Sequence, residues 1–584
     1  MRPLLLLLFS LPLLLAAQSG PITGQVVDAE TDDPLVGVNV LLAATPIGTV
    51  TDIAGRFSIT AASESGKLRL VFSYVGYETR TINASPGDSL GRISLQPAED
   101  KLKEVIVMGY SQRRKHDAMG SLNNQYYSAP AAPYDYGRPE QYNSIEENGW
   151  VQTNKQAIST LSTDVDRASY ANVRRFIEEG SLPPADAVRS EEMINYFNYD
   201  DPAPTGDEPL ALYTETGACP WNPENQILRV AIRAKDISRD DLPAANLVFL
   251  LDVSGSMQGP DRLDLLKKSM LLLVDQLRPQ DRISIVVYAG AAGLVLPPTP
   301  GDQGSVIRDA ISELSAGGST AGGAGIKLAY ATAEEHFIPG GNNRIILATD
   351  GDFNVGTSSQ NALVDLIEQK RTSGVYLTVL GFGRGNYQGG TMQELADRGN
   401  GNHAYIDGLL EAKKTLIEEF GGTLVTVAKD VKVQLAFDPK AVAAYRLIGY
   451  ENRLLNAEDF DDDTKDAGEI GAGHRVTVLY EIIPGTARSE ELAELRIRYK
   501  APEGGYSREL TTKVNATETS ASDNLNWAAA VAEFAMLLRE SEHRGAANYP
   551  DCMTRARAAR GEDPNGYRGE MIGLMERAAG LAKK

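Results

Sequence analysis

Two aspartates and three hydroxyl residues have the types and positions that suit either metal binding or nucleophilic chemistry. Asp252 ends the apolar run "NLVFLLD", and Ser254 and Ser256 follow it at alternate positions. Asp350 ends another apolar run, "RIILATD", and Thr320 lies between the two runs in the glycine-rich "LSAGGSTAGGAG". Side chains alternate along an extended chain, so Asp252 and both serines can project to one side. The five side chains are therefore candidates for one shared site.

A site made only of oxygen donors suits a hard divalent cation. Mg²⁺ or Mn²⁺ fits best, because each takes about six oxygen ligands and keeps some waters, and Ca²⁺ ranks after them. Hydroxyls are neutral, weak donors, so they leave the metal electrophilic. Its open position would attract an acidic group from a partner protein. We therefore expect metal ligands at Asp252, Ser254, Ser256, Thr320 and Asp350.

Other readings of these residues stay open at this point. Ser256 could cap a helix that begins near Asp261, although that reading leaves the matching threonine and second aspartate unexplained. Ser319 could replace its neighbour Thr320 as a donor. Asp352 could be a further ligand or could cap the turn that follows.

A serine nucleophile would need a base within hydrogen-bond reach. The stretch "DVSGSM" lacks the flanking glycines of G-x-S-x-G, and His336 and His403 are the only histidines between residues 243 and 428. His336 falls on a predicted helix, and His403 falls near the start of a predicted strand. We find no catalytic constellation and expect a protein that is not an enzyme, with a hydrolase as the weakest hypothesis.

The elements that must position these residues lie in residues 243–428, where apolar runs alternate with amphipathic segments. Continuous apolar runs are typical of strands covered on both faces. The pattern predicts an α/β doubly wound domain with a mainly parallel sheet and helices on both faces. Ligands of such sheets bind at the carboxyl ends of the strands, where Asp252 and Asp350 would meet.

These motifs resemble the von Willebrand factor type A family. "DVSGS" is similar to the family's Asp-x-Ser-x-Ser, with Thr320 and the aspartate of "TDG" completing its metal-ion-dependent adhesion site. The resemblance implies that Ser254, Ser256 and Thr320 contact the metal directly and that the two aspartates often act through water. Residues 156–242 and 429–584 resemble the extensions of a bacterial secreted subfamily of unknown activity.

The N-terminal residues read as export and β-sheet signals. Residues 1–19 have a basic start, an apolar stretch too short for a bilayer and small residues near a cut, which is typical of a signal peptide. Residues 20–98 alternate short strands with turns, which predicts a small β-sandwich. "PLVGVNV", "GTVTDIAGRFS" and "SYVGY" resemble the carboxypeptidase regulatory-like domain of Bacteroidetes outer-membrane receptors, which implies a non-catalytic module.

The remaining segments carry weaker signals. Residues 99–155 lack apolar periodicity and read as a linker, and within them Glu104–Tyr110 resembles the stretch that opens the plug of those receptors. We prefer to interpret that stretch as a terminal strand and a basic linker. Residues 156–242 are an N-terminal extension in which Asp164 and Asp166 read as a turn and helix cap, residues 429–516 an accessory β region, and residues 517–584 a helical tail.

Net charge, cysteine count and the length of the apolar stretches limit which partners and which cellular locations we expect. A formal net charge of −21 speaks against tight nucleic-acid binding. Only Cys219 and Cys552 are present, so at most one disulfide is possible. After the signal peptide no stretch is long enough to span a membrane. We expect a periplasmic, outer-membrane-associated or extracellular protein that binds an unknown protein through a metal. The alternative is a metal-independent envelope scaffold positioned by its N-terminal β-sandwich.

Overall fold

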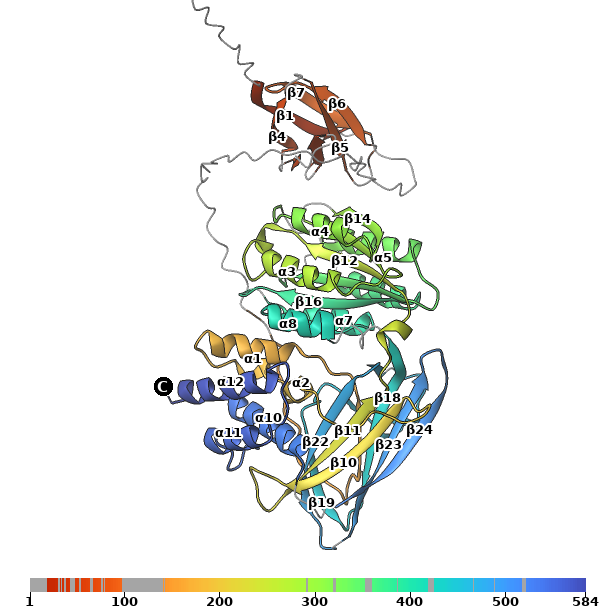
Figure 1. Cartoon of the computed structure of the whole chain (residues 1–584), viewed down its shortest axis with the longest axis vertical. Helices are drawn as coiled ribbons and strands as arrows, with labels where there is room; N and C mark the ends of the chain where they lie inside the picture. The colour runs from red at the N-terminus through yellow and green to blue at the C-terminus, as the bar shows by residue number, and fades with distance from the viewer. Residues whose placement is uncertain are drawn as a thin grey trace, which may run out of the picture.

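The structure is a computed structural model (Figure 1). It describes residues 18–96, with short gaps, and residues 140–583, with gaps at 141, 290–291, 319–321, 352–359, 386, 419–424, 466, 488 and 517–520. Thr320, Ser319, Asp352 and the stretch Glu104–Tyr110 lie outside the described residues. So does most of the predicted signal peptide, whose last two residues begin the first strand.

The N-terminal module is a β-sandwich, as the sequence predicts. One sheet has the strand order β4-β1-β7 and the other the order β3-β2-β5-β6. Both sheets bury apolar side chains in a single core that includes Ile22, Val40, Phe57 and Phe72. The strands are β1 (Gln18–Asp28), β2 (Asn39–Leu42), β3 (Gly48–Val50), β4 (Arg56–Ser63), β5 (Leu68–Ser73), β6 (Arg80–Ala84) and β7 (Ser89–Leu95).

The middle of the chain folds into an α/β domain around one sheet. Its order is β14-β13-β12-β15-β16-β17, and every pairing is parallel except that of the edge strand β14. Alternate residues of β12 face opposite cores: Phe249 packs into one and Leu250 into the other. The strands are β12 (Ala245–Asp252), β13 (Arg282–Tyr288), β14 (Ala292–Pro300), β15 (Asn342–Thr349), β16 (Val375–Phe382) and β17 (His403–Ile406).

Helices cover both faces of this sheet, so the predicted doubly wound fold is confirmed. α3, α4 and α8 supply residues to the core that contains Phe249, whereas α5, α6 and α7 supply residues to the core that contains Leu250. The helices are α3 (Leu263–Val274), α4 (Gly304–Glu313), α5 (Gly322–Glu335), α6 (Gln360–Arg371), α7 (Gly389–Arg398) and α8 (Leu409–Lys413), and a π-helical turn, η4 (Lys414–Glu418), continues α8.

A second β-sandwich is built from segments on either side of the α/β domain. Its sheets have the orders β10-β11-β22-β19-β8 and β20-β9-β18-β23-β24, and β21 pairs with β18. The strands are β8 (Val151–Gln152), β9 (Ile158–Ser162), β10 (Leu210–Ala218), β11 (Gln226–Ala234), β18 (Thr426–Phe437), β19 (Val442–Ile448), β20 (Leu454–Leu455), β21 (Gly468–Gly471), β22 (Arg475–Pro484), β23 (Glu491–Ala501) and β24 (Gly504–Asn515).

This arrangement joins two regions that the sequence treats separately. Strands β9 to β11 precede the α/β domain in the chain, yet they share sheets and one core with strands that follow it. The packing also begins before residue 156, in the stretch read as linker, because β8 pairs with β19 and Thr153 donates its backbone N–H to Ala443.

The C-terminal helices α10, α11 and α12 pack with helices α1 and α2, which precede the α/β domain in the chain (Figure 1). Their core contains Cys219 and Cys552, which are both buried free thiols. Among the described residues no helix is long and apolar enough to cross a membrane. The helices are α1 (Ala168–Glu178), α2 (Ser190–Asn195), α10 (Asp523–Arg539), α11 (Tyr549–Ala558) and α12 (Tyr567–Leu581).

Candidate metal site at the end of strand β12

Asp252 is held rigidly at the carboxyl end of β12. Its side chain is fully buried. One carboxylate oxygen accepts a hydrogen bond from the backbone N–H of Ser254 at 2.9 Å. The other accepts from the hydroxyls of Tyr288 at 3.1 Å and Thr349 at 3.2 Å. These donors end the neighbouring parallel strands β13 and β15, so the register of the sheet places them around the carboxylate.

The two serines lie next to each other, as their spacing predicts. The hydroxyl oxygens of Ser254 and Ser256 are 2.9 Å apart. Ser256 lies in a short 3₁₀ turn, η3 (Gly255–Met257), and Ser254 is the N-cap residue of that turn. Ser254 is buried and Ser256 is exposed, so the two hydroxyls extend from the interior of the domain to its surface. The capping alternative for Ser256 is wrong, because α3 starts at Leu263 and its N-cap is Arg262, which makes no side-chain cap bond.

Asp350 brings a second buried carboxylate to this edge. It directly follows β15 and is only 2% exposed. Burial, above all, raises the pKa of Asp252 to about 6, and the negative charge of Asp350 acts in the same direction. Two carboxylates close enough to repel each other inside the protein, beside paired hydroxyls, form a donor set that fits a hard divalent cation.

The loop that carries Thr320 approaches the serine turn. Gly317 donates its N–H to the carbonyl of Val253 at 2.7 Å, and Gly255 donates to the carbonyl of Gly318 at 3.0 Å. The structure thus brings the start of this loop to the serine turn, while Thr320 itself lies outside the described residues. Within the described part of the chain, no three His, Cys, Asp or Glu residues form a metal-holding group. The candidate site is of another kind, with two serine hydroxyls and two carboxylates.

The histidines of the domain lie elsewhere. His403 begins β17 and Asp252 ends β12, and strands β15 and β16 lie between these two strands in the sheet, so the two residues are three strands apart. Burial lowers the pKa of His403 to about 4, and its ring nitrogen lies 3.3 Å from the hydroxyl of Tyr387. His336 lies beside Glu335, 4.0 Å from its carboxylate. Neither position pairs a base with the serines.

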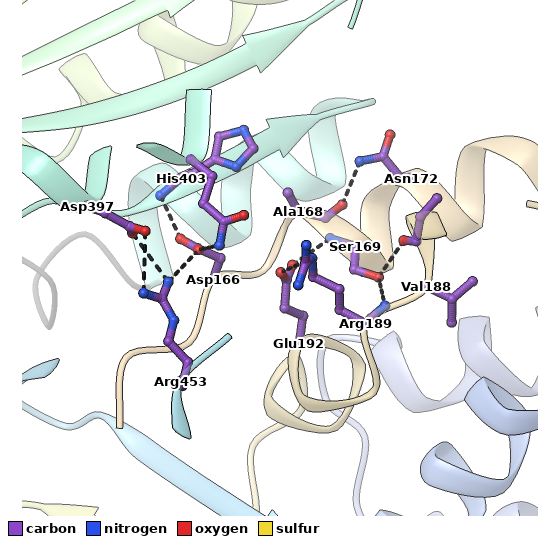
Figure 2. Close-up of polar contacts among 12 residues, drawn as sticks. Asp166, Ala168, Ser169, Asn172, Val188, Arg189, Glu192, Asp397, His403 and Arg453 are labelled. Carbon is purple, nitrogen blue, oxygen red and sulfur yellow. Dashed lines mark hydrogen bonds and ion pairs between the residues drawn. The ribbon is translucent and has the colours of Figure 1, made fainter. Parts of the chain in front are cut away.

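Asp166 plays a part that the sequence reading missed. It does not cap α1; instead it links the α/β domain to the sandwich (Figure 2). One of its oxygens accepts from Gln393 at 2.6 Å and from Arg453 at 3.2 Å, and the other accepts from the backbone N–H of His403 at 3.2 Å. Asp397 also pairs with Arg453, at 3.3 Å. No spacing pattern in the sequence predicts this cluster, because its members are far apart along the chain.

This cluster predicts a pH-dependent stability. Burial and the charge of Asp166 raise the pKa of Asp397 from an ordinary 3.8 to about 7, although Arg453 opposes the shift. Because the pKa of Asp397 is raised in the folded state, the contribution of this carboxyl group to the free energy of unfolding is fully present below pH 3.8 and is lost as the pH rises through 7. Asp397→Asn removes the ionisable group, so the variant does not lose this part of its stability as the pH rises. The side chain of Asp397 is 29% exposed, so water screens part of the effect. We expect the variant's advantage over the wild type to grow by about 1–2 kcal/mol between pH 5 and pH 8.

Urea unfolding at a series of pH values measures this difference. The matched control is Glu368→Gln, which removes a partly exposed carboxylate paired with Arg398 and should leave the pH profile unchanged. Profiles of wild type and Asp397→Asn that run parallel from pH 5 to pH 8 would contradict the charge assignment.

The comparisons with known proteins agree with this architecture. A von Willebrand factor type A domain model matches residues 247–352, and a von Willebrand factor model matches residues 137–229. A CarboxypepD_reg-like domain model matches residues 22–107. The model for the C-terminal part of the uncharacterized protein YfbK matches residues 422–490 and 485–581. Both family resemblances drawn from the sequence are therefore confirmed.

Individual relatives cover different parts of the chain. The uncharacterized protein YfbK of Escherichia coli (strain K12) is 43% identical over 466 residues, which cover 75% of this chain and 81% of the relative. The TonB-dependent receptor P39 of Formosa agariphila is 37% identical over 110 residues, or 19% of this chain and 10% of the receptor. The crystal structure of the conserved hypothetical protein BatB from Bacteroides thetaiotaomicron is 26% identical and covers 30% of this chain and 97% of its own, with a TM-score of 0.26.

Proposed function

Because this chain belongs to the family of the uncharacterized protein YfbK and contains a von Willebrand factor type A domain, we propose that it binds a protein partner through a divalent metal ion. Domains of this type form a protein-interaction family. The proposed ligands are Asp252, Ser254, Ser256, Thr320 and Asp350. The observation that carries the proposal is the 2.9 Å serine pair at the same sheet edge as two buried, mutually repelling carboxylates.

The described residues have distinct parts in this proposal. Ser254 and Ser256 would give neutral oxygens to Mg²⁺ or Mn²⁺, and Asp252 and Asp350 would supply the negative charge that holds the ion. Tyr288 and Thr349 fix the carboxylate of Asp252 through hydrogen bonds, so its orientation is set before any ligand arrives. The bound metal would supply an electrophilic open position for an acidic side chain of the partner. This role is binding, without turnover.

The N-terminal module supports an envelope location for this activity. A segment of this chain is similar to TonB-dependent receptors, and the module matches the CarboxypepD_reg-like model. We extend the proposal to export, with the β-sandwich of residues 20–98 placing the von Willebrand factor type A domain near outer-membrane components. A second candidate, favoured by the same similarity, is a scaffold that is positioned in the envelope by this module and needs no metal.

A capture experiment with the full chain separates the two candidates. Immobilised wild-type protein should retain a partner from envelope extract in Mg²⁺, lose it in EDTA and recover it when Mg²⁺ is restored. Ser254→Ala should abolish capture, because it removes a buried donor, whereas Ser305→Ala, an exposed serine on α4, should not. Capture that persists in EDTA and in Ser254→Ala, but is lost when residues 20–98 are deleted, would contradict the metal-dependent role and favour the scaffold.

A further inference from the structure

A cavity of about 390 Å³ lies between the α/β domain and the second β-sandwich. Residues at the amino end of β12, such as Ala245 and Leu247, contribute to its wall, whereas Asp252 ends that strand. The end of α3 and the residues after it, the segment before β12, the turn η4, the turn that leads into β22, and Arg167 and Asn198 also contribute to the wall. The cavity is therefore separate from the candidate metal site.

The wall of this cavity is cationic, although the chain as a whole has a net charge of −21. Its permanently charged bases are Arg167, Arg239, Arg278, Lys414 and Arg475, and its acids are Asp236, Asp281 and Glu418.

Each of these acids already has a cation. Asp281 pairs with Arg278 at 2.7 Å. Asp236 pairs with Arg233 at 2.6 Å, and Glu418 with Lys413 at 3.4 Å, and neither of these two bases lines the cavity. The wall therefore holds more bases than acids, and only Arg278 among its bases is shown paired with an acid of the wall.

Among the bases of the wall, Arg475 has a like-charged neighbour and a buried nitrogen without a hydrogen-bond partner among the described residues. It lies directly opposite Arg233 in the pairing of β22 with β11, and like charges in that position destabilise a sheet. Its Nε atom is buried and has no hydrogen-bond partner among the described residues. Burial, above all, and the charge of Arg233 lower the pKa of Arg475, although the carboxylates of Asp236, Asp200 and Asp201 oppose this shift, so the net effect of its surroundings is to disfavour the positive charge. An anion in the cavity would relieve this imbalance.

Arg167 and His474 lie in the same wall as Arg475. Arg167 donates to a ring nitrogen of His474 at 2.8 Å, so this nitrogen accepts and its side of the ring carries no proton. Arg167, His474 and Arg475 share the cavity with the apolar side chains of Leu277 and Ile417. A ligand with an oxyanion and a small carbon body matches that mixture.

We propose that this cavity binds a small oxyanion, a phosphate or carboxylate group of a soluble ligand, with Arg475 as its main cationic contact and Arg167 beside it. The site is independent of the metal, since it uses other residues at the other end of β12. A ligand in this cavity would lie between the α/β domain and the second β-sandwich.

Thermal melting and calorimetry of the full chain test the proposal. Sodium phosphate and sodium citrate serve as probes, in EDTA to keep metals out, with sodium chloride matching the ionic strength. We expect at least one probe to bind and to raise the melting temperature. Arg475→Gln should weaken binding by at least about tenfold, because it removes a charged hydrogen-bond donor. The control Arg508→Gln, an exposed arginine on β24, should bind as the wild type does.

A second readout distinguishes binding from a structural role. Without anion, Arg475→Gln should melt at the same temperature as the wild type or higher, because it removes the repulsion with Arg233. The proposal is overturned if neither probe raises the melting temperature above that in chloride, if Arg475→Gln binds as tightly as the wild type, or if the variant melts lower without anion.

Discussion

Replacing Arg174 by alanine is expected to lower the free energy of unfolding by about 3–5 kcal/mol. Arg174 lies on α1, and its side chain is only 4% exposed. It donates to Asp407 at 2.7 Å, to Glu411 at 2.7 Å and to Glu570 at 3.0 Å. The first two acids belong to the α/β domain and the third to α12, so one guanidinium ties three segments together.

The large effect follows from what the substitution leaves behind. Without the guanidinium, two nearly buried carboxylates would face each other with no arginine between them, and leaving a buried charge unpaired costs far more than an intact pair contributes. Burial already raises the pKa of Glu411, and Arg174 opposes that shift. The carboxylates would have to take up protons or draw in water, and either change loosens the contact of the α/β domain with α1 and α12.

Urea unfolding of Arg174→Ala and of a matched arginine variant measures this effect. Arg557→Ala breaks the ion pair with Glu576, in which both side chains are 53% exposed. Exposed pairs contribute about 0–1 kcal/mol, so this control should unfold almost as the wild type does. A loss of less than about 1 kcal/mol in Arg174→Ala would contradict the account of Arg174 as the link between the segments.

Asp252→Asn is expected to abolish the stabilisation of the protein by Mg²⁺. The wild type should gain about 2.7 kcal/mol when the metal is present at 100 times its dissociation constant. Asparagine has nearly the same shape and can still accept from the N–H of Ser254, while the hydroxyls of Tyr288 and Thr349 can accept as well as donate. The change therefore removes the charge and keeps the packing.

The same substitution should act in the opposite direction when no metal is present. It relieves the repulsion between Asp252 and Asp350, so the variant in EDTA should melt at the same temperature as the wild type or higher. Asp264→Asn, an exposed acid in the first turn of α3, is the control and should keep the full response to Mg²⁺. Equal stabilisation of Asp252→Asn and wild type by Mg²⁺ would remove Asp252 from the metal site.

Much of this site could be predicted from the sequence, because the physics that places it is local. Apolar runs predict buried parallel strands, and the carboxyl ends of such strands meet at one edge, which brings Asp252 near Asp350. Alternation along the chain after Asp252 also places Ser254 beside Ser256. The helix cap proposed for Ser256 failed because α3 starts later, at Leu263.

What could not be predicted depends on contacts between distant residues. Alternating patterns indicate that β11 and β22 are strands, but nothing in either segment indicates that Arg229 pairs with Leu479 across the intervening α/β domain. Asp166 likewise reads as a helix cap from its neighbours alone. Its bonds reach Gln393 and Arg453, and no periodicity encodes those partners.

Locating the metal itself tests the central claim most directly. Crystals of the full chain grown with Mn²⁺, measured at the manganese absorption edge, should show an anomalous peak in contact with the hydroxyls of Ser254 and Ser256. Crystals of Asp252→Asn grown in the same way should show no peak there. Manganese found only at other positions, or equally at this position in both proteins, would contradict a metal-bridged binding site at the end of β12.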